Sequence, residues 1–159
     1  MNNINKNNIF KIGIDIHGVI SSMPDFFSFL SESIIKNNGE VHIITGGSWT
    51  PELVNLLKSF NIKYTHYFSV YDYLKSICAE ENGRIQFPDG KTQKKFDSNL
   101  WDSIKGKYCK ENNIDLHIDD TEIYSKYFTT SFLLFKSGDD LEKLSHIDLI
   151  NSSNVVKKI

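Results

Sequence analysis

Residues able to bind metal ions and phosphate follow three separate apolar runs of the chain. The three sets are Asp15-Ile16-His17-Gly18, Thr45-Gly46-Gly47 and Asp119-Asp120. Carboxylates are ligands of hard cations such as Mg²⁺, and an aspartate carboxylate can also attack phosphorus to form an acyl phosphate. A threonine hydroxyl and the backbone N–H groups of a glycine pair can donate hydrogen bonds to a phosphoryl oxygen. These residue types therefore predict a site for a metal ion and a phosphate group.

Each set taken alone also has a structural explanation. An aspartate after a strand commonly caps a helix or forms a turn, a Thr-Gly-Gly sequence is an ordinary turn, and an Asp-Asp pair is common in solvated loops. What favours the catalytic interpretation is the combination, because each set closes an apolar run.

The apolar runs and the periodic segments between them predict alternating strands and helices. The predicted strands are residues 10–16, 41–45, 64–70, 114–118 and 131–135, and the predicted helices are residues 24–38, 52–60, 71–79 and 98–112. Thr50 and Asp97 or Ser98 are suited to cap two of these helices, and Gly39 is suited to close the first. Residues 84–95 contain Phe87-Pro88-Asp89-Gly90, which predicts a surface hairpin or ordered loop.

Alternating strands and helices predict an α/β fold, here a Rossmann-like three-layer domain with a mostly parallel central sheet. The carboxyl ends of parallel strands lie at one edge of the sheet, and ligands bind there. The three sets of residues are therefore expected to converge at that edge.

Length and composition fit one soluble domain. The chain has 159 residues, with a core over about residues 10–136, a polar tail at 1–8 and a C-terminal extension at 139–159. The net charge of -2 provides no global cationic field for nucleic acid or a membrane surface. Two cysteines form no disulfide framework, and residues 1–8 do not resemble a signal peptide, so we expect a cytoplasmic protein without a membrane partner.

Three segments carry a resemblance to a known family. The segments are GIDIHGVI, VHIITGG and IDLHIDD, and they resemble three motifs of the haloacid dehalogenase-like (HAD) phosphohydrolase superfamily over roughly residues 10–135. The resemblance implies a Rossmann-like fold with no large cap domain and Mg²⁺-dependent hydrolysis of a phosphomonoester through an aspartyl phosphate. The implied substrate is a small phosphorylated molecule, such as a nucleotide, or a nucleic-acid end. A capless site is also compatible with an oligomer.

The resemblance assigns roles to individual residues. Asp15 matches the nucleophile and a direct metal ligand, and the main-chain carbonyl of His17 matches a second metal contact. Asp119 or Asp120 matches the metal ligand of the acidic motif, and Asp120 is favoured. Thr45 matches the phosphate-binding hydroxyl, and Gly46 and Gly47 follow it in the phosphate-binding segment.

The family's lysine has three candidates in this sequence. Lys105 is favoured because it precedes IDLHIDD by a short distance, and Lys94 and Lys95 are the alternatives. A helix that begins at Ser98 would put Lys105 in mid-helix beside an apolar stripe, which counts against it.

His17 occupies the position where the family's phosphatases usually carry an aspartate as general acid/base. Imidazole is able to donate and accept a proton near neutral pH. His17 is thus either a substituted acid/base or the mark of an impaired member that serves as a phosphate-binding or protein-interaction module. His42 and His117 lie inside predicted strands and are expected to be hydrogen-bonded core residues, whereas His66 has no recognisable partner.

Overall fold

A five-stranded parallel sheet forms the centre of the computed structural model, which describes residues 9–86, 90 and 92–138. The strands lie in the order β3-β2-β1-β6-β7, and every neighbouring pair is parallel. Their bounds are β1 Lys11–Ile14, β2 Glu40–Thr45, β3 His66–Ser69, β6 Leu116–Asp119 and β7 Ser131–Leu134. The predicted α/β class and parallel sheet are confirmed.

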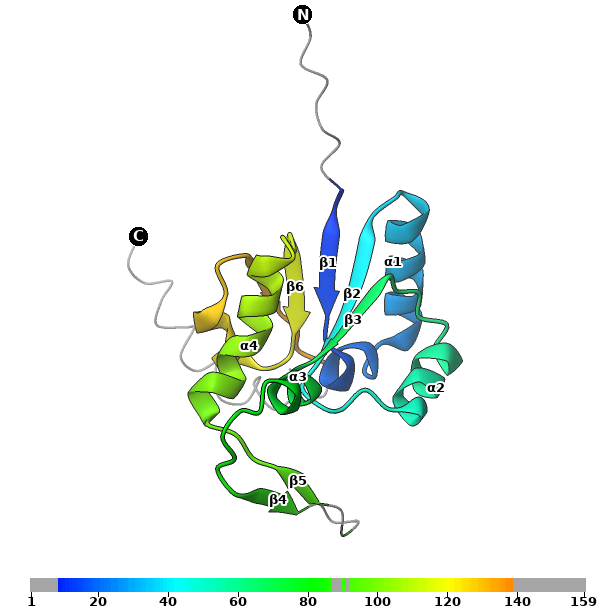
Figure 1. Ribbon diagram of the computed structural model, residues 1–159. Coiled ribbons are helices and arrows are strands. Elements are labelled where there is room, and N and C mark those ends of the chain that lie inside the picture. Colours follow the sequence, from blue (N-terminus) through cyan, green and yellow to red (C-terminus); the bar gives the residue numbers. More distant parts are fainter. Residues whose placement is uncertain (1–8, 87–89, 91, 139–159) are drawn as a thin grey trace, which may run out of the picture.

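Helices cover both faces of this sheet (Figure 1). They are α1 Pro24–Lys36, α2 Pro51–Ser59, α3 Val70–Ser76 and α4 Ser98–Glu111. Adjacent residues of β2 point to opposite faces, so Ile43 packs in the cluster that contains Phe27 of α1 and Leu57 of α2. Ile44 packs with Cys109 of α4 instead. The result is the predicted Rossmann-like arrangement of three layers.

The predicted caps of α2 and α4 are confirmed, whereas Val70, predicted to end a strand, begins α3. The Thr50 hydroxyl accepts a hydrogen bond from the Leu53 N–H (3.3 Å), and an Asp97 carboxylate oxygen accepts one from the Leu100 N–H (2.9 Å). The end of α1 differs from expectation. Asn38, with φ of 61°, adopts the left-handed conformation, and the Gly39 N–H then bonds to the Ile34 carbonyl (2.9 Å).

Two short helical segments were not predicted. Residues Ile16–Ile20 form a tight turn, η1, and Glu122–Tyr127 form a 3₁₀ helix, η2. The first predicted strand therefore ends at Ile14 instead of Ile16. Ile16, Val19 and Ile20 are fully buried, so their apolar character reflects packing of the turn and not extension of the strand.

A small antiparallel hairpin, β4 Arg84–Gln86 and β5 Thr92–Lys94, projects from the carboxyl-end edge of the sheet (Figure 1). The strands of the predicted hairpin are confirmed, whereas its predicted Phe87-Pro88-Asp89 turn lies outside the described residues, as do segments 1–8 and 139–159. Among the described helices, each is too short or too polar to cross a bilayer.

Candidate functional site

Three carboxylates meet at the carboxyl-end edge of the sheet. Asp15 follows β1, Asp119 is the last residue of the neighbouring strand β6, and Asp120 comes next. One oxygen of each side chain lies within 4.8 Å of one oxygen of the other two. The chain order of the sheet strands reverses direction at the boundary between β1 and β6, which is where ligands of doubly wound sheets bind. The predicted convergence of these residues is thus present.

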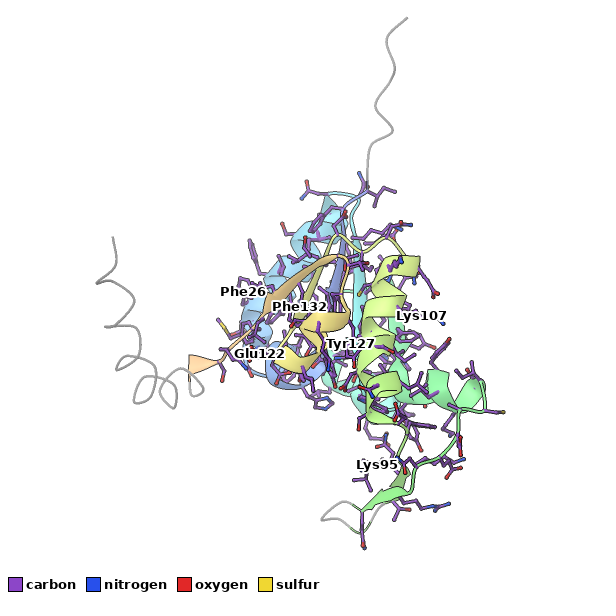
Figure 2. All side chains as sticks on the ribbon, turned by 90° about the vertical axis from the view of Figure 1, so that its left-hand side faces the viewer. Phe26, Lys95, Lys107, Glu122, Tyr127 and Phe132 are labelled. Atoms are coloured by element: carbon purple, nitrogen blue, oxygen red, sulfur yellow. The ribbon has the colours of Figure 1, made fainter. Side chains whose placement is uncertain are left out.

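Lys105 of α4 lies between two of the three carboxylates. Its Nζ donates a hydrogen bond to Oδ1 of Asp15 (2.7 Å) and one to Oδ2 of Asp119 (2.6 Å), and its side chain is almost fully buried. The mid-helix position that counted against Lys105 is real, but α4 crosses the sheet so that this residue faces the strand ends. Lys94 forms an ion pair with Glu81 instead. Lys95 belongs to the hairpin region, beneath α4 in Figure 2.

Burial and the lysine set the protonation of the two buried carboxyls. Burial raises the pKa of Asp15 to about 6, although the charge of Lys105 opposes that rise. Burial also works to raise the pKa of Asp119, but hydrogen bonds from His117 and Lys105 and the lysine charge outweigh it and lower the pKa to about 2. The two carboxylates in turn raise the pKa of Lys105 despite its burial. At neutral pH the charges of Asp15 and Asp119 outnumber the single charge of Lys105, so the site favours an added cation.

Asp119 and Asp120 differ in how many of their oxygens are already engaged. Oδ2 of Asp119 accepts hydrogen bonds from Lys105 and from Nε2 of His117 (3.1 Å), and its Oδ1 accepts one from the Thr121 N–H (3.0 Å). Asp120 is half-buried, and its Oδ1 accepts one hydrogen bond from the Thr121 hydroxyl (3.1 Å). Asp120 is thus the more available ligand, and Asp119 mainly holds Lys105 in position.

Gly18 explains how Asp120 can approach the turn after Asp15. Its φ is +75°, in the region that side chains rarely adopt, and a Cβ at this position would collide with the Asp120 carboxylate. Gly18 therefore allows both the backbone conformation of the turn and the close approach of the Asp120 carboxylate.

Thr45, at the end of β2, contributes an unpaired hydroxyl. Its Oγ1 is buried and has no hydrogen-bond partner within the described part of the chain. Buried hydroxyls are normally hydrogen-bonded, so this hydroxyl has the capacity to donate to a ligand at the carboxyl end of β2. The role of Thr45 as a phosphate contact stays a prediction.

The glycine segment after Thr45 is held in position by the start of α3. The Ser69 hydroxyl donates to the Gly47 carbonyl (2.8 Å), and the Tyr71 N–H donates to the Gly46 carbonyl (3.2 Å). An Asp72 carboxylate oxygen accepts from the Trp49 N–H (2.7 Å). These bonds turn the segment into a fixed loop, and Ser69 and Asp72 are supporting residues that the sequence analysis missed.

His17 lines a pocket of about 450 Å³ at the same edge of the sheet. Its side chain is exposed, in contrast to the neighbouring Asp15. The hairpin, the start of α4 and the glycine segment supply the other walls, which consist of Gly46, Gly47, Ile85, Gln93, Lys94, Lys95, Phe96, Ser98, Trp101 and Asp102. Among the described residues that line the pocket, His17 is the one that belongs to the turn after Asp15, and none of the three carboxylates takes part.

Three aromatic or imidazole side chains near Lys105 were not predicted to belong to the site. The Tyr124 ring lies 5.0 Å from Nζ of Lys105, and the Trp101 Nε1–H donates to the Tyr124 hydroxyl (3.4 Å). His117 is fully buried, as expected, and its contact with Asp119 links the core to the site. The His117–Asp119 spacing is an i, i+2 pair on one face of a strand, a signal that was present in the sequence.

The oxygen-rich set of Asp15, Asp119 and Asp120 fits a hard divalent cation. Mg²⁺ prefers carboxylate oxygens and keeps several waters, and the half-buried Asp120 leaves one side of the cluster accessible. The His17 main-chain carbonyl belongs to the same turn as Asp15 and stays a predicted ligand.

Comparisons with protein-family models, with curated proteins and with solved structures found no match to this chain.

Proposed function

We propose that this protein is a Mg²⁺-dependent phosphohydrolase of the HAD-like class that cleaves a phosphomonoester through an aspartyl phosphate. The observation that carries the proposal is the cluster of Asp15, Asp119 and Asp120 with the buried Lys105 at the switch point of the sheet. The unpaired hydroxyl of Thr45 and the fixed glycine segment give further support, because a phosphoryl group needs donors at this place.

In the proposed first step, a carboxylate oxygen of Asp15 attacks the phosphorus atom and the bond to the leaving oxygen breaks. A protonated His17 imidazole gives its proton to that oxygen, so that an alcohol leaves. Lys105 and Thr45 stabilise the negative charge on the phosphoryl oxygens. Bound Mg²⁺ would supply further charge neutralisation and orient the phosphate.

In the proposed second step, the neutral imidazole of His17 takes a proton from water and the resulting hydroxide attacks the aspartyl phosphate. The acyl phosphate bond breaks, inorganic phosphate leaves, and the Asp15 carboxylate is restored. The exposure of His17 in the pocket suits both transfers, because its ring is accessible to a leaving group and to water.

The pocket wall favours a substrate with an apolar or aromatic part. Ile85, Phe96 and Trp101 supply apolar surface, and Lys95 supplies positive charge, while the lining residue Lys94 is paired with Glu81. An aryl phosphate or a nucleotide combines a flat apolar group with an anion and fits this composition. A nucleic-acid end would have to enter from the hairpin side.

The decisive experiment compares the wild-type protein with Asp15→Asn in hydrolysis of p-nitrophenyl phosphate with Mg²⁺. The substitution is nearly isosteric and removes the nucleophile, so we expect activity to fall by several orders of magnitude. Asp25→Asn is the matched control, because Asp25 is an exposed carboxylate in the first turn of α1. It should keep wild-type activity.

Wild-type protein without activity towards aryl phosphates, nucleotides and phosphorylated DNA ends would contradict the phosphohydrolase proposal. It would favour the alternative of a phosphate-binding or protein-interaction module. Activity that persists in Asp15→Asn at the wild-type level would contradict the aspartyl-phosphate route.

A further inference from the structure

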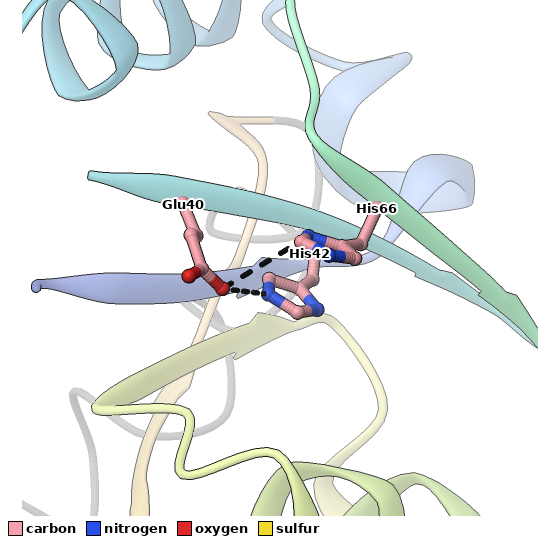
Figure 3. Close-up of side chains that lie close together, drawn as sticks. All are labelled: Glu40, His42 and His66. Atoms are coloured by element: carbon pink, nitrogen blue, oxygen red, sulfur yellow. Dashed lines mark hydrogen bonds and ion pairs between the residues drawn. The ribbon is translucent and has the colours of Figure 1, made fainter. Parts of the chain in front are cut away.

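A second group of potential metal ligands lies at the other end of β2. Glu40 and His42 are two residues apart on this strand and therefore point to the same face, and His66 of the edge strand β3 is the direct partner of His42 in the sheet (Figure 3). One ligand atom of each side chain lies within 4.8 Å of one ligand atom of the other two. Thr45 is five positions after Glu40 on β2, so this group is roughly 16 Å from the carboxyl end of the strand.

The distances between the ligand atoms are close to those that a metal requires. Nε2 of His42 lies 3.0 Å from Oε2 of Glu40, and Nδ1 of His66 lies 3.9 Å from the same oxygen. In a tetrahedral zinc site with bonds near 2.0–2.1 Å, neighbouring ligand atoms are about 3.3 Å apart. Conversion of one set of distances to the other requires the side chains of His66 and Glu40 to rotate, and both are at least partly exposed.

The two imidazole rings are stacked, so one ring has to tilt before the in-plane lone pairs of both nitrogens meet at one ion. Their centroids are 4.3 Å apart and their planes differ by 14°, and both rings direct a nitrogen towards Glu40 (Figure 3). The cross-strand pairing holds the two backbones at a fixed spacing, so the ligand geometry does not depend on a flexible loop. A ligand set built on two paired strands loses little conformational entropy when it binds an ion.

Tyr108 of α4 orients the buried histidine. Its hydroxyl lies 2.8 Å from Nδ1 of His42, and burial raises the pKa of that hydroxyl to about 12, so it stays protonated. A metal-binding histidine usually donates its other ring N–H to an oxygen acceptor, which fixes the tautomer. The Tyr108 oxygen is placed to accept from Nδ1–H once Nε2 binds a metal.

This group of ligands can be reached from solvent, and a lysine already contacts its carboxylate. The side chain of His66 is 53% exposed and that of Glu40 is 24% exposed, so an ion can enter from solvent although His42 is buried. Nζ of Lys11 lies 3.1 Å from Oε2 of Glu40 and is the cation that currently neutralises it. Lys11 would have to give up this contact or move to the other carboxylate oxygen.

We propose that Glu40, His42 and His66 form a Zn²⁺ site with three protein ligands and one position for water. Two imidazoles and one carboxylate are a ligand set that Zn²⁺ uses in proteins, whereas Mg²⁺ strongly prefers oxygen ligands. The site is independent of the proposed phosphohydrolase centre. Its structural effect is to tie the edge strand β3 to β2, because the metal joins side chains of both strands.

The test is a Zn²⁺ titration of the full chain followed by NMR of the histidine ring nitrogens and by thermal unfolding. We expect one equivalent of Zn²⁺ to shift the ring signals of His42 and His66 and to raise the midpoint of unfolding, while Mg²⁺ leaves those two rings unchanged. His66→Ala and Glu40→Gln should each weaken Zn²⁺ binding by more than about tenfold, because even loss of a group that only orients a ligand has an effect of about 10–100-fold. His66 is exposed, so its replacement should leave the metal-free fold intact.

Two control variants separate binding at this site from a general effect of Zn²⁺ on histidines or on surface charge. His17→Ala removes a histidine at the opposite edge of the sheet and should bind Zn²⁺ at His42 and His66 as the wild type does. Lys11→Met removes the competing cation and should bind Zn²⁺ at least as tightly as the wild type. Unchanged Zn²⁺ affinity in His66→Ala, no shift of the His42 and His66 rings, or equal weakening in Lys11→Met and Glu40→Gln would each overturn the proposal.

Discussion

His17 is the residue on which the proposed chemistry depends most directly. It lines the pocket, lies within the turn that begins after Asp15, and stands where the resemblance leads us to expect an aspartate. Its side chain makes the proton transfers in our proposal, while its main-chain carbonyl is the predicted metal contact. Substitutions therefore separate the two roles, because they change the imidazole and keep the carbonyl.

Replacement of His17 by alanine should lower kcat for p-nitrophenyl phosphate by about 10²–10⁴-fold, the usual contribution of a general acid/base. His17→Asp should keep or increase activity, since a carboxylate in this position can perform the same transfers. Steady-state kinetics at saturating Mg²⁺ measure both effects. Equal rates for the wild type and both variants would show that the imidazole has no chemical role.

Gly18 offers a second test at the residue scale. Gly18→Ala places a Cβ against the Asp120 carboxylate and forces alanine into the left-handed region, which costs roughly 1–2 kcal/mol. We expect lower stability and also loss of Mg²⁺-dependent stabilisation, because Asp120 must move. Thermal unfolding with and without Mg²⁺ measures both.

Gly83→Ala is the matched control for this prediction. Gly83 also has a positive φ, of 90°, but open space surrounds the position of its missing Cβ. It should lose a similar amount of stability and keep the full response to Mg²⁺. If Gly18→Ala also keeps that response, the contact between Gly18 and Asp120 has no part in metal binding.

The residues of the candidate site differ in how far the sequence revealed them. Asp15, Thr45 and Asp119 could be found because each directly follows or ends a buried strand, a position that local apolar patterns predict. Lys105 was favoured, but its reach depends on the rotation and crossing of α4 over the sheet, which no local pattern contains. Tyr124 and Ser69 act through contacts across 19 or more residues of chain and left no recognisable signal.

At the scale of elements, α4 combines a site residue with core residues on adjacent turns. Lys105 faces the carboxylates, and the next residue, Gly106, lies against the main chain of Tyr127 in η2. Figure 2 shows Tyr127 beside α4. Cys109 packs against Ile44 of the sheet. A Cβ at Gly106 would collide with the Tyr127 carbonyl, so close packing of α4 and η2 requires glycine here. The position of Lys105 is therefore a consequence of the packing of the whole helix.

The reactivity of the two cysteine thiols can be used to test the packing of α4. Cys109 is fully buried and burial raises the pKa of its thiol to about 12, whereas Cys78 is exposed. We expect an aromatic disulfide reagent to modify one thiol per native chain and two in denaturant. Cys78→Ser should remove the native reaction, and rapid modification of Cys109 in the native protein would show that α4 is not held as described.

The elements themselves were largely predictable, and the two exceptions have different causes. Strong apolar periodicity and good caps marked α2 and α4 within one or two residues. The turn η1 was missed because its isoleucines and valine are buried by tertiary packing, and in sequence they look like a continued strand. The 3₁₀ helix η2 was missed because it has no buried residue of its own.

At the scale of the molecule, metal binding should appear as added stability. A ligand present at about 100 times its Kd and bound only by the folded state adds about 2.7 kcal/mol. For a chain of this size, each kcal/mol raises the midpoint of unfolding by about 2–4 °C. We therefore expect a clear upward shift with Mg²⁺, measured by differential scanning calorimetry.

Asp120→Asn should abolish most of this shift, because Asp120 is the most available of the three carboxylates. Asp25→Asn serves as the control that changes the net charge equally and should respond as the wild type does. An unchanged shift in Asp120→Asn would remove Asp120 from the proposed metal site.

The central position of β1 also has a consequence for the synthesis of this protein. On one side, Ile12 of β1 pairs with Val41 of β2, which follows it by about 30 residues. On the other side, Ile12 pairs with Leu116 of β6, which follows it by about 100 residues. At the usual 5–20 residues per second, a ribosome needs roughly 5–20 s to make that interval. Meanwhile, the nascent sheet has an open apolar edge at β1, the type of surface that promotes aggregation. Chaperone supply and codon choice between β3 and β6 should therefore govern the soluble yield more than codon choice after β7.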